Sequence, residues 1–469
     1  MSGATFAFMA PLMFAGLVVI LLLGYPVAFA LAANGLLFAF VGIQSGFFDF
    51  SLLQALPERV YGIVSNQTLL AIPFFTFMGL VLERSGMAEE LLDTIGQLFG
   101  RVRGGLAYAV VLVGALLAAT TGVMAASVIA MGLISLPIML RYGYDKRLAS
   151  GVITASGTLA QIVPPSIVLI VLADQLGVSV GDMYTGALAP GLTLAGLYLL
   201  YVLGVTLVKP DAVPALPPQA RRLRGAALAQ RAAVSLIPPL VLIFLVLGTI
   251  FLGVATPTEG GALGAAGAVV LAALRRRLTL DVLKQAMDST ARLTSFVIFI
   301  LIGSTVFSLV FRGVDGDLWV ESLLTHLPGG VVGFLVVVNL LVFSLAFFLD
   351  FFEIAFIVVP LLAPVAAKLG IDPIWFGVLL GVNMQTSFMH PPFGFALFYL
   401  RSVAPKNIRT TDIYWGAVPF VLIQVVMVAI VLAFPQIVGQ APLAISGESI
   451  EIPMPVDPNA GYLLPPDKR

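Results

Sequence analysis

The sequence predicts an all-α polytopic membrane protein made of two inverted repeats, each with a re-entrant hairpin and a broken transmembrane helix. Composition is the first observation behind this fold class, because 60% of the 469 residues are hydrophobic and only 10% are charged, whereas soluble domains carry about 25% charged residues. The second is an apolar stretch at 149–173 that is interrupted by polar residues and by Pro164-Pro165. The third is a matching stretch at 374–400, which is interrupted at Pro391-Pro392.

The first repeat is predicted at residues 1–208 from the lengths of its apolar runs, because about 20 apolar residues cross a bilayer. Residues 104–140 are apolar for longer than one crossing needs, so we expect a re-entrant hairpin there, with its tip at 120–127. The broken helix follows at 147–173. The other predicted elements are spans at 6–23 and 27–47, an interfacial helix at 51–66, a span at 68–82, an amphipathic helix at 86–100, a polar loop at 174–186 and a span at about 187–208.

The second repeat is predicted at residues 232–436, after a polar linker at 209–231 that we expect to be cytoplasmic. It follows the same plan, with a hairpin at about 331–367 and a broken helix at 374–400. A polar tail at 437–469 ends the sequence. The remaining elements are spans near 233–254 and 259–274, an amphipathic stretch at 278–293, a span at 294–311 and a last span at 414–435.

The two repeats share spacing as well as composition. Asp145 precedes the first proline pair by 19 positions, and Asp372 precedes the second by the same 19. Paired prolines remove two amide donors and forbid regular helix just before them, so both helices must break at membrane depth. Broken backbone is tolerated there only where protein or a cavity supplies hydrogen bonds. Two such breaks at corresponding positions predict the central site of a secondary transporter.

The basic residues predict the orientation. When both hairpins are counted as re-entrant, most lysines and arginines fall on the side of the linker, which is the positive-inside pattern. The same count inverts the two repeats relative to each other and places both termini outside. The basic residues left on the outer side are Arg59, Arg312, Lys368, Lys468 and Arg469.

The predicted site is built from polar groups at the two breaks and the two hairpin tips. A cation that leaves water needs oxygen ligands, about 6 to 8 of them in the case of calcium, and unwound segments offer carbonyls, hydroxyls and amides. For any single Ser, Thr or Gly, close helix packing is the alternative role. The side chains and glycine that we expect to meet there are Ser156, Gly157, Thr158 and Gln161 near the first tip, and Gln385, Thr386 and Ser387 near the second tip at 350–353.

Three ionisable residues have open roles. Asp350 is expected either to cap the second arm of its hairpin or to contact a cation, since charged groups at membrane depth are costly and functional. Glu259 is expected to cap a helix together with Thr256. His390 lies beside the second proline pair, but its counterpart is Val163, so a symmetric proton relay is not expected.

Several classes of protein are disfavoured. The chain has no cysteine and a formal net charge of zero, which argues against thiolate chemistry and a nucleic-acid partner. It has no Walker-type glycine loop and no nucleophile elbow. A membrane-embedded enzyme would need a catalytic set at membrane depth, where the only histidine is His390. A channel would keep a continuous pore. We therefore expect a transporter driven by an ion gradient, without an enzymatic cofactor.

Four segments resemble the large membrane subunit (the DctM-like permease) of tripartite ATP-independent periplasmic (TRAP) transporters, and the resemblance runs from about residue 7 to 436. They are ASGTLAQIVPPSIVLIVLA, RYGYDKRLASGVITASG, GVATPTEGGALGAAGA and LGIDPIWFGVLLGVNMQTSF. The resemblance implies a sodium-coupled elevator transporter in the bacterial inner membrane that imports a small organic acid. It also implies two partners, which are a small four-span membrane subunit and a periplasmic substrate-binding protein.

The resemblance further implies sodium sites at the two tips and the two unwound segments. Carried onto this sequence, these positions are Thr121, Gly122, Ser156, Gly157, Thr158, Asp350, Gln385, Thr386 and Ser387. The segment QTSFMHPPFGFALFYLRSVAP is similar to the branch labelled mannitol or chloroaromatic type. The alternative function is a self-sufficient proton- or sodium-coupled anion symporter of the same superfamily, which would need no binding protein.

Overall fold

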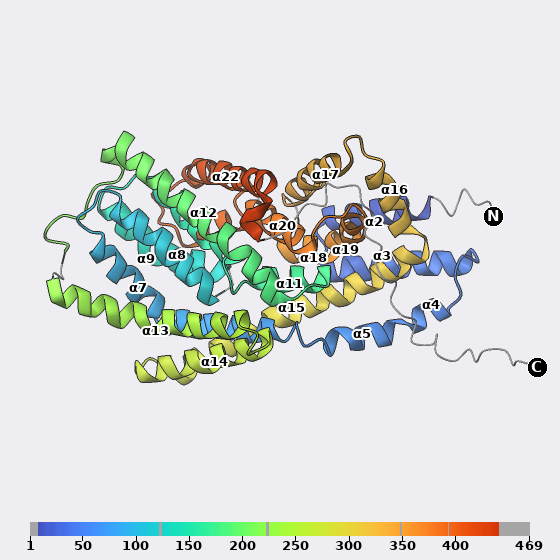
Figure 1. Cartoon of the computed structure of the whole chain (residues 1–469), viewed down its shortest axis with the longest axis horizontal. Helices are drawn as coiled ribbons and strands as arrows, with labels where there is room; N and C mark the ends of the chain where they lie inside the picture. Colours follow the sequence, from blue (N-terminus) through green and yellow to red (C-terminus); the bar gives the residue numbers. More distant parts are fainter. Residues whose placement is uncertain (1–7, 122–123, 222–224, 348, 393, 440–469) are drawn as a thin grey trace, which may run out of the picture.

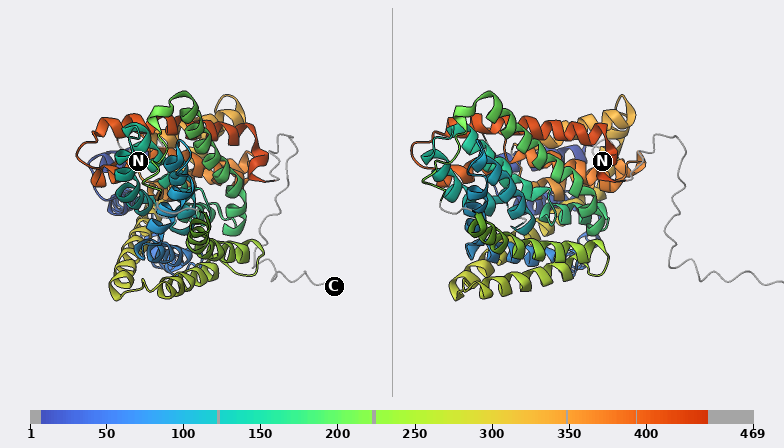
Figure 2. Two further views of the ribbon diagram at one scale, coloured as in Figure 1. Left: turned by 90° about the vertical axis from the view of Figure 1, so that its left-hand side faces the viewer. Right: turned by 60° about the vertical axis from the view of Figure 1, so that its left-hand side comes forward.

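The computed structural model describes residues 8–121, 124–221, 225–347, 349–392 and 394–439. These residues are mostly helical and include no strand. Six helices among them are long and apolar enough to cross a membrane, or up to eight if each of two bent helix pairs counts as one span. In Figure 1, α13, α14 and α15 lie along one long side of the molecule and α12 and α22 along the other, and the same separation is visible in Figure 2. The predicted all-α membrane fold is confirmed.

The first half contains the predicted hairpin and the first broken helix. The hairpin consists of α8 and α9, and we call this pair hairpin 1. The broken helix consists of α10 and α11, joined through a 3-10 turn. The helices of this half are α2 (Met9–Leu22), α3 (Val27–Gln44), α4 (Ser51–Gln54), α5 (Leu56–Val64), α6 (Ala71–Arg84), α7 (Met87–Leu98), α8 (Gly105–Thr121), α9 (Met124–Arg141), α10 (Lys146–Thr158), η1 (Leu159–Gln161), α11 (Ile167–Leu176), α12 (Val180–Val208) and η2 (Pro210–Ala212).

The second half repeats this plan. Hairpin 2 consists of α17, α18 and α19, and α18 is bent by 50° relative to α19. The second broken helix consists of α20 and α21. The helices of this half are α13 (Gly225–Phe251), α14 (Pro257–Leu274), α15 (Leu280–Gly313), α16 (Gly316–Thr325), α17 (Gly330–Leu345), α18 (Phe351–Ile357), α19 (Val359–Lys368), α20 (Pro373–Ser387), α21 (Phe395–Val403), α22 (Thr410–Ala433) and η3 (Pro435–Val438).

Three boundaries differ from the predictions. The polar loop expected at 174–186 is short, because Gly177 ends α11 in a left-handed conformation and Ser179 accepts a hydrogen bond from the backbone N–H of Asp182 to start α12. The amphipathic stretch at 278–293 and the span at 294–311 form one helix, α15, because no Gly or Pro separates them. Helix α13 begins at Gly225, inside the predicted linker at 209–231. The tail beyond residue 439 lies outside the described residues.

The two repeats interlock through equivalent helix pairs. Asp145 and Asp372 lie 227 positions apart (372 − 145), and a similar offset relates α3 to α14 and α6 to α15. The structure packs α3 against α15 and α6 against α14. A Cβ atom on Gly303 would lie 2.2 Å from the carbonyl oxygen of Ala28, and one on Gly264 would lie 2.5 Å from the sulfur of Met78. Close approach at small residues is the usual way for membrane helices to gain packing contacts. These four helices therefore form one framework contributed by both repeats.

The amphipathic helix α7 is fixed to this framework by a partly buried charge cluster. Glu90 accepts a hydrogen bond from Ser235 at 2.8 Å and pairs with Arg275 and Arg277 at 3.2 Å each. Burial raises the pKa of Glu90, but the Ser235 hydrogen bond and the two arginine charges together outweigh burial and hold this pKa below its ordinary value. Glu90 is therefore ionised at neutral pH and ties α7 to α13 and to the end of α14.

Candidate functional site

Both predicted breaks are present and are built in the same way. Asp145 caps α10 by accepting hydrogen bonds from the backbone N–H groups of Arg147 and Leu148, and Asp372 caps α20 by accepting from that of Trp375. After α10 the chain passes through Pro164-Pro165 before α11, and after α20 it passes through Pro391-Pro392 before α21. Both Pro-Pro peptide bonds are cis. The spacing shared by the two halves therefore reflects equivalent local structures.

The two broken helices meet at equivalent residues. Thr158 and Gln385 each lie 13 positions after the capping aspartate of their own half, and the side-chain amide of Gln385 donates to the hydroxyl oxygen of Thr158 at 3.2 Å. Both side chains are fully buried. A hydrogen bond between equivalent residues places this contact at the centre of the two-fold arrangement.

Two further helices reach the same point, and their residues were not among the predicted site residues. Gln424 of α22 donates from its amide nitrogen to the Thr158 hydroxyl oxygen at 3.2 Å and to the hydroxyl oxygen of Tyr198 of α12 at 2.9 Å. Gln424 and Tyr198 are also fully buried. The available signal was a glutamine in the middle of an apolar span, since polar groups inside membrane helices are costly and functional.

Three buried amide oxygens at this site have no hydrogen-bond partner among the described residues. They belong to Gln161, Gln385 and Gln424. An unpaired buried acceptor costs about 1–3 kcal/mol, so native structures provide a partner for nearly all of them. Amide oxygens are good ligands for hard cations. The cluster can therefore hold a small cation or ordered water.

Ser156 and Gly157 lie against hairpin 1, where their size matters. A Cβ atom on Gly157 would lie 2.3 Å from a methyl carbon of Val128, and one on Gly114 would lie 2.5 Å from the Cβ of Ser156. The Ser156 hydroxyl donates to the carbonyl oxygen of Val152 at 2.6 Å, within its own helix. Both residues therefore have a packing role here, and their role as sodium ligands stays a prediction.

Thr386 and Ser387 also bond within their own helix. The Thr386 hydroxyl donates to the carbonyl oxygen of Asn383 at 2.6 Å, and the Ser387 hydroxyl donates to that of Met384 at 2.5 Å. Each hydroxyl oxygen keeps lone pairs for another contact. At the tip of hairpin 1, Gly122 and the side chain of Thr121 lie outside the described residues.

A cavity of about 240 Å³ joins both hairpins to both broken helices. It is lined by Met124 and Ala125 at the start of α9, by Gln161 at the first break, by Asp350 at hairpin 2 and by aromatic residues that include Phe388 and Tyr399. The first residues of α11 and α21, Ile167 and Phe395, line it as well. The structure thus brings two predicted site residues, Gln161 and Asp350, into one cavity beside the Thr158 cluster.

Asp350 has the capping role that was one of its two predicted roles. Its carboxylate accepts from the backbone N–H of Glu353 at 2.8 Å, and the Glu353 carboxylate accepts from the backbone N–H of Asp350 at 2.8 Å. Such a capping box fixes the start of α18. Glu259 and Thr256 form the same kind of box at the start of α14, as expected. Because Asp350 also lines the cavity, its capping role leaves cation contact as a prediction.

His390 is buried between two aromatic rings of hairpin 2. The ring centroids of Phe343 and Phe347 lie 4.1 Å and 4.4 Å from that of His390. Neither ring nitrogen of His390 has a hydrogen-bond partner among the described residues. The aromatic contacts give His390 a packing role beside Pro391.

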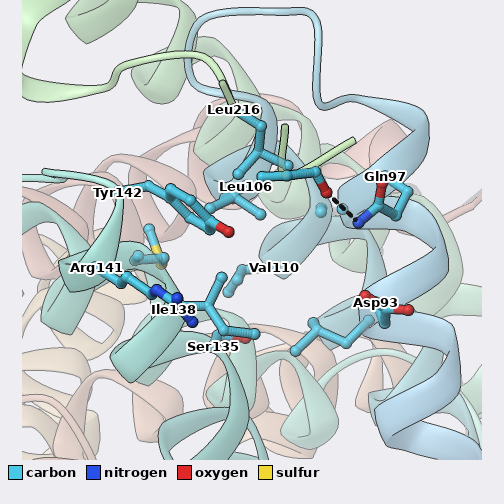
Figure 3. A pocket seen from close by; sticks show the side chains of 14 residues that line it. Asp93, Gln97, Leu106, Val110, Ser135, Ile138, Arg141, Tyr142 and Leu216 are labelled. Carbon is cyan, nitrogen blue, oxygen red and sulfur yellow. Dashed lines mark hydrogen bonds between the residues drawn. The ribbon is translucent and has the colours of Figure 1, made fainter. Parts of the chain in front are cut away.

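A cavity of about 280 Å³ near α7 is separate from this site (Figure 3). It lies between α7, hairpin 1 and the segment that follows η2, and Gln97 closes part of its rim by donating to the carbonyl oxygen of Ala220 at 3.2 Å. Figure 3 shows Arg141 and Tyr142 on one side and Asp93 on the other. None of the predicted site residues lines it. The cavity at the two breaks is therefore the better candidate for the transport site.

Comparison with known proteins identifies the family. Residues 14–437 match the model of the family described as "Tripartite ATP-independent periplasmic transporter, DctM component". The chain belongs to this family. It is therefore a multi-pass protein of the bacterial inner membrane and a transport protein rather than an enzyme. The predicted resemblance to the TRAP large subunit is confirmed, whereas the mannitol or chloroaromatic branch stays a prediction.

Individual relatives of this TRAP protein agree. The chain is 32% identical to the C4-dicarboxylate TRAP transporter large permease protein DctM of Pseudomonas aeruginosa over 386 residues, which covers 82% of this chain and 88% of the relative. It is 30% identical to the DctM protein of Rhodobacter capsulatus over 450 residues, covering 91% and 99%. Among solved structures, the YdaH transporter of Alcanivorax borkumensis has the same fold, with a TM-score of 0.55, 17% identity and coverage of 84% of this chain and 91% of that chain.

Proposed function

We propose that this chain is the membrane subunit through which a sodium gradient drives import of a small organic acid. The observation that carries the proposal is the Thr158 cluster, where both broken helices meet and three buried amide oxygens lack partners. Sodium is a hard cation that prefers oxygen ligands of this kind. Binding of sodium would supply the missing contacts and hold the two breaks together, so it would favour the state that accepts the cargo.

The cargo site in this proposal is the cavity at the two breaks. The N-terminal residues of α11 and α21 line it, and a helix N-terminus carries a partial positive charge that favours anions. Phe388 and Tyr399 offer apolar contact, and Gln161 offers an amide. This combination suits a carboxylate attached to a small carbon skeleton, and the named relatives carry C4-dicarboxylates.

The proposed mechanism is an elevator. Helices α3, α6, α14 and α15 form the fixed framework, and the hairpins with the broken helices form the moving part. Among the described residues, two hydrogen bonds join the framework side to the moving part. Asn66, in the segment just before α6, donates to the Asp174 carboxylate at 2.7 Å, and Ser304 of α15 donates to the carbonyl oxygen of Phe356 at 2.5 Å. Both must break when the moving part slides along the framework.

We propose two partners for the complete transporter. One is a small four-span membrane subunit that would cover the exposed apolar surface of α13, which packs beside the framework helix α14. Phe244 of α13 and Leu252 just after it are 71% and 81% exposed. The other is a periplasmic protein that captures the acid and delivers it to the outer face. The family's description as tripartite supports both.

The test is uptake into proteoliposomes that contain this chain, its small partner and its binding protein. We expect uptake of the acid only with an inward sodium gradient, and Thr386→Trp should abolish uptake while the variant still inserts and folds. Equal uptake with potassium in place of sodium would refute the coupling. Uptake by this chain without the binding protein would favour a self-sufficient symporter.

A further inference from the structure

Another polar cavity, of about 330 Å³, lies between the framework and the moving part. Arg59 of α5 and the last turns of α15 line one side of it. Asp174 at the end of α11 and Pro360 of hairpin 2 line the other. It is distinct from the cavity at the two breaks, with which it shares no lining residue. We call it the outer cavity, because the basic-residue pattern places this end of α15 outside the membrane.

The charge in the outer cavity is unusual for its side of the membrane. Basic residues are sparse on the outer side of membrane proteins, and in the described part of this chain the predicted outer ones are Arg59, Arg312 and Lys368. Lys368 pairs with Glu321 at 2.5 Å. Arg59 and Arg312 both line the outer cavity, and neither has an ion-pair or hydrogen-bond partner among the described residues. The two unpaired outer cations thus converge on one cavity.

The negative group in the cavity is already engaged. Asp174 accepts a hydrogen bond from the side-chain amide of Asn66 at 2.7 Å and another from that of Gln175 at 2.9 Å. Two arginines against one aspartate leave the cavity with a net positive charge. An arginine fork binds carboxylates through paired hydrogen bonds, and no carboxylate of the described residues occupies either fork.

Helix α15 adds hydroxyl donors to the same side of the cavity. Thr305, Ser308 and Arg312 are spaced by three and four positions, so they lie on one face of the helix. Phe296 of the same helix lines the cavity at the two breaks. At 1.5 Å per residue, Arg312 lies about 24 Å from Phe296 along the helix axis. Helix α15 thus lines both cavities, and the outer cavity lies nearer its C-terminal end than the cavity at the two breaks.

We propose that the outer cavity is a capture site for carboxylates, where the acid group of the cargo binds Arg59 and Arg312 before it moves to the cavity at the two breaks. This proposal rests on the proposed import function and adds a site to it. A positively charged entrance raises the local concentration of an anion and speeds its association. The outer cavity lies between the framework and the moving part. When the moving part slides along the framework, cargo bound in the outer cavity would therefore reach the cavity at the two breaks.

The first experiment measures the charge of the cavity without relying on transport. Because the chain has no cysteine, Ser308→Cys introduces a single thiol into this chain of the reconstituted transporter, and labelling is measured on this chain. At each thiol we measure the labelling rate of a negatively charged sulfonate methanethiosulfonate, divided by that of its positively charged ammonium analogue. We expect this ratio to be about tenfold higher at Ser308→Cys than at Ser322→Cys. Ser322 is an exposed control position on α16 outside the cavity. Arg59→Gln with Arg312→Gln should bring the two ratios together.

The same thiol tests carboxylate binding directly. Succinate is the probe, and its uncharged diamide is the control. We expect succinate to slow labelling of Ser308→Cys and the diamide to leave it unchanged. Equal reactivity ratios at the two thiols, or no protection by succinate, would overturn the proposal. If wild-type uptake proves independent of sodium, the proposed function fails, but this labelling result still decides whether the outer cavity binds a carboxylate.

The second experiment measures uptake by the complete transporter. Arg59→Gln with Arg312→Gln should raise the KM for the loaded binding protein about tenfold and change the maximal rate less than about twofold. Each single substitution should raise this KM about threefold, so the single variants still test the proposal if the double variant does not accumulate. Lys368→Gln removes an outer charge away from the cavity and should leave the KM unchanged. If binding-protein affinity for the membrane subunit falls in parallel with the KM, the arginines dock that protein and the proposal is wrong.

Discussion

Thr158 is the residue on which the two halves of the site depend. Its hydroxyl oxygen accepts from Gln385 and Gln424, and its hydroxyl hydrogen is donated to the carbonyl oxygen of Ala155 at 2.8 Å. No other described hydroxyl links α10, α20 and α22 in this way. Thr154, one turn earlier, is equally buried but donates only to carbonyl oxygens of its own helix. The comparison separates a hydroxyl that joins helices from one that does not.

We therefore predict that Thr158→Val destabilises the protein and impairs sodium-driven uptake. Valine keeps the shape but removes the acceptor of one N–H of Gln385 and one N–H of Gln424, which should cost about 1–3 kcal/mol. Thr158→Ser should retain most activity, and Thr154→Val is the matched control. Thermal unfolding in nanodiscs and initial uptake rates measure the two effects. Similar losses in both valine variants would show that Thr158 has no special linking role.

At the scale of single elements, the position of α10 depends on its contact with α22. A Cβ atom on Gly151 would lie 2.0 Å from the carbonyl oxygen of Gly416, and one on Gly416 would lie 2.1 Å from the carbonyl oxygen of Arg147. The contacting atoms are backbone carbonyl oxygens, which cannot move to another position as the end of a flexible side chain can. The two glycines therefore set the distance between α10 and α22, and with it the reach of Gln424 to Thr158.

We expect Gly151→Ala and Gly416→Ala each to lower stability by about 1–3 kcal/mol, because an added methyl group forces tightly packed backbones apart. Gly196→Ala in α12 is the control, since a Cβ atom there meets nothing within 4 Å. That control should be neutral or slightly stabilising, because alanine is the better helix former. Midpoints of thermal unfolding would measure all three, and a neutral Gly416→Ala would contradict the packing argument.

For the whole molecule, the elevator proposal makes a prediction about motion. Asn66 and Asp174 lie on opposite sides of the boundary between framework and moving part. A short bifunctional thiol reagent that bridges Asn66→Cys and Asp174→Cys should stop uptake, and reduction should restore it. Arg84 of α6 and Ser289 of α15 also lie in contact, at 2.9 Å, but within the framework. Bridging Arg84→Cys and Ser289→Cys should leave uptake intact. Continued uptake by the first bridged pair would exclude sliding at this boundary.

Local rules made a large part of the fold predictable. A proline pair lacks two amide donors wherever it lies, so the breaks before Pro164-Pro165 and Pro391-Pro392 followed from the residues alone. The equal offsets from Asp145 and Asp372 predicted the repeat, and the structure shows both as helix caps. These features depend on interactions within about one or two helical turns. Boundaries were less predictable, as α15 shows, because no Gly or Pro marks the point near residue 294 where its amphipathic part passes into the membrane span.

By itself the sequence determined the class of protein, the two repeats and the two breaks, because apolar length and missing backbone donors are properties of short segments. Only the tertiary structure decided which polar groups meet. Gln424 and Tyr198 reach Thr158 because α22 and α12 pack beside α10, and Asp350 both caps α18 and lines the central cavity. Arg59 and Arg312 lie 253 positions apart in the sequence yet share one cavity. These contacts between distant residues depend on how the helices of both repeats pack together, and the sequence of a short segment does not determine that packing.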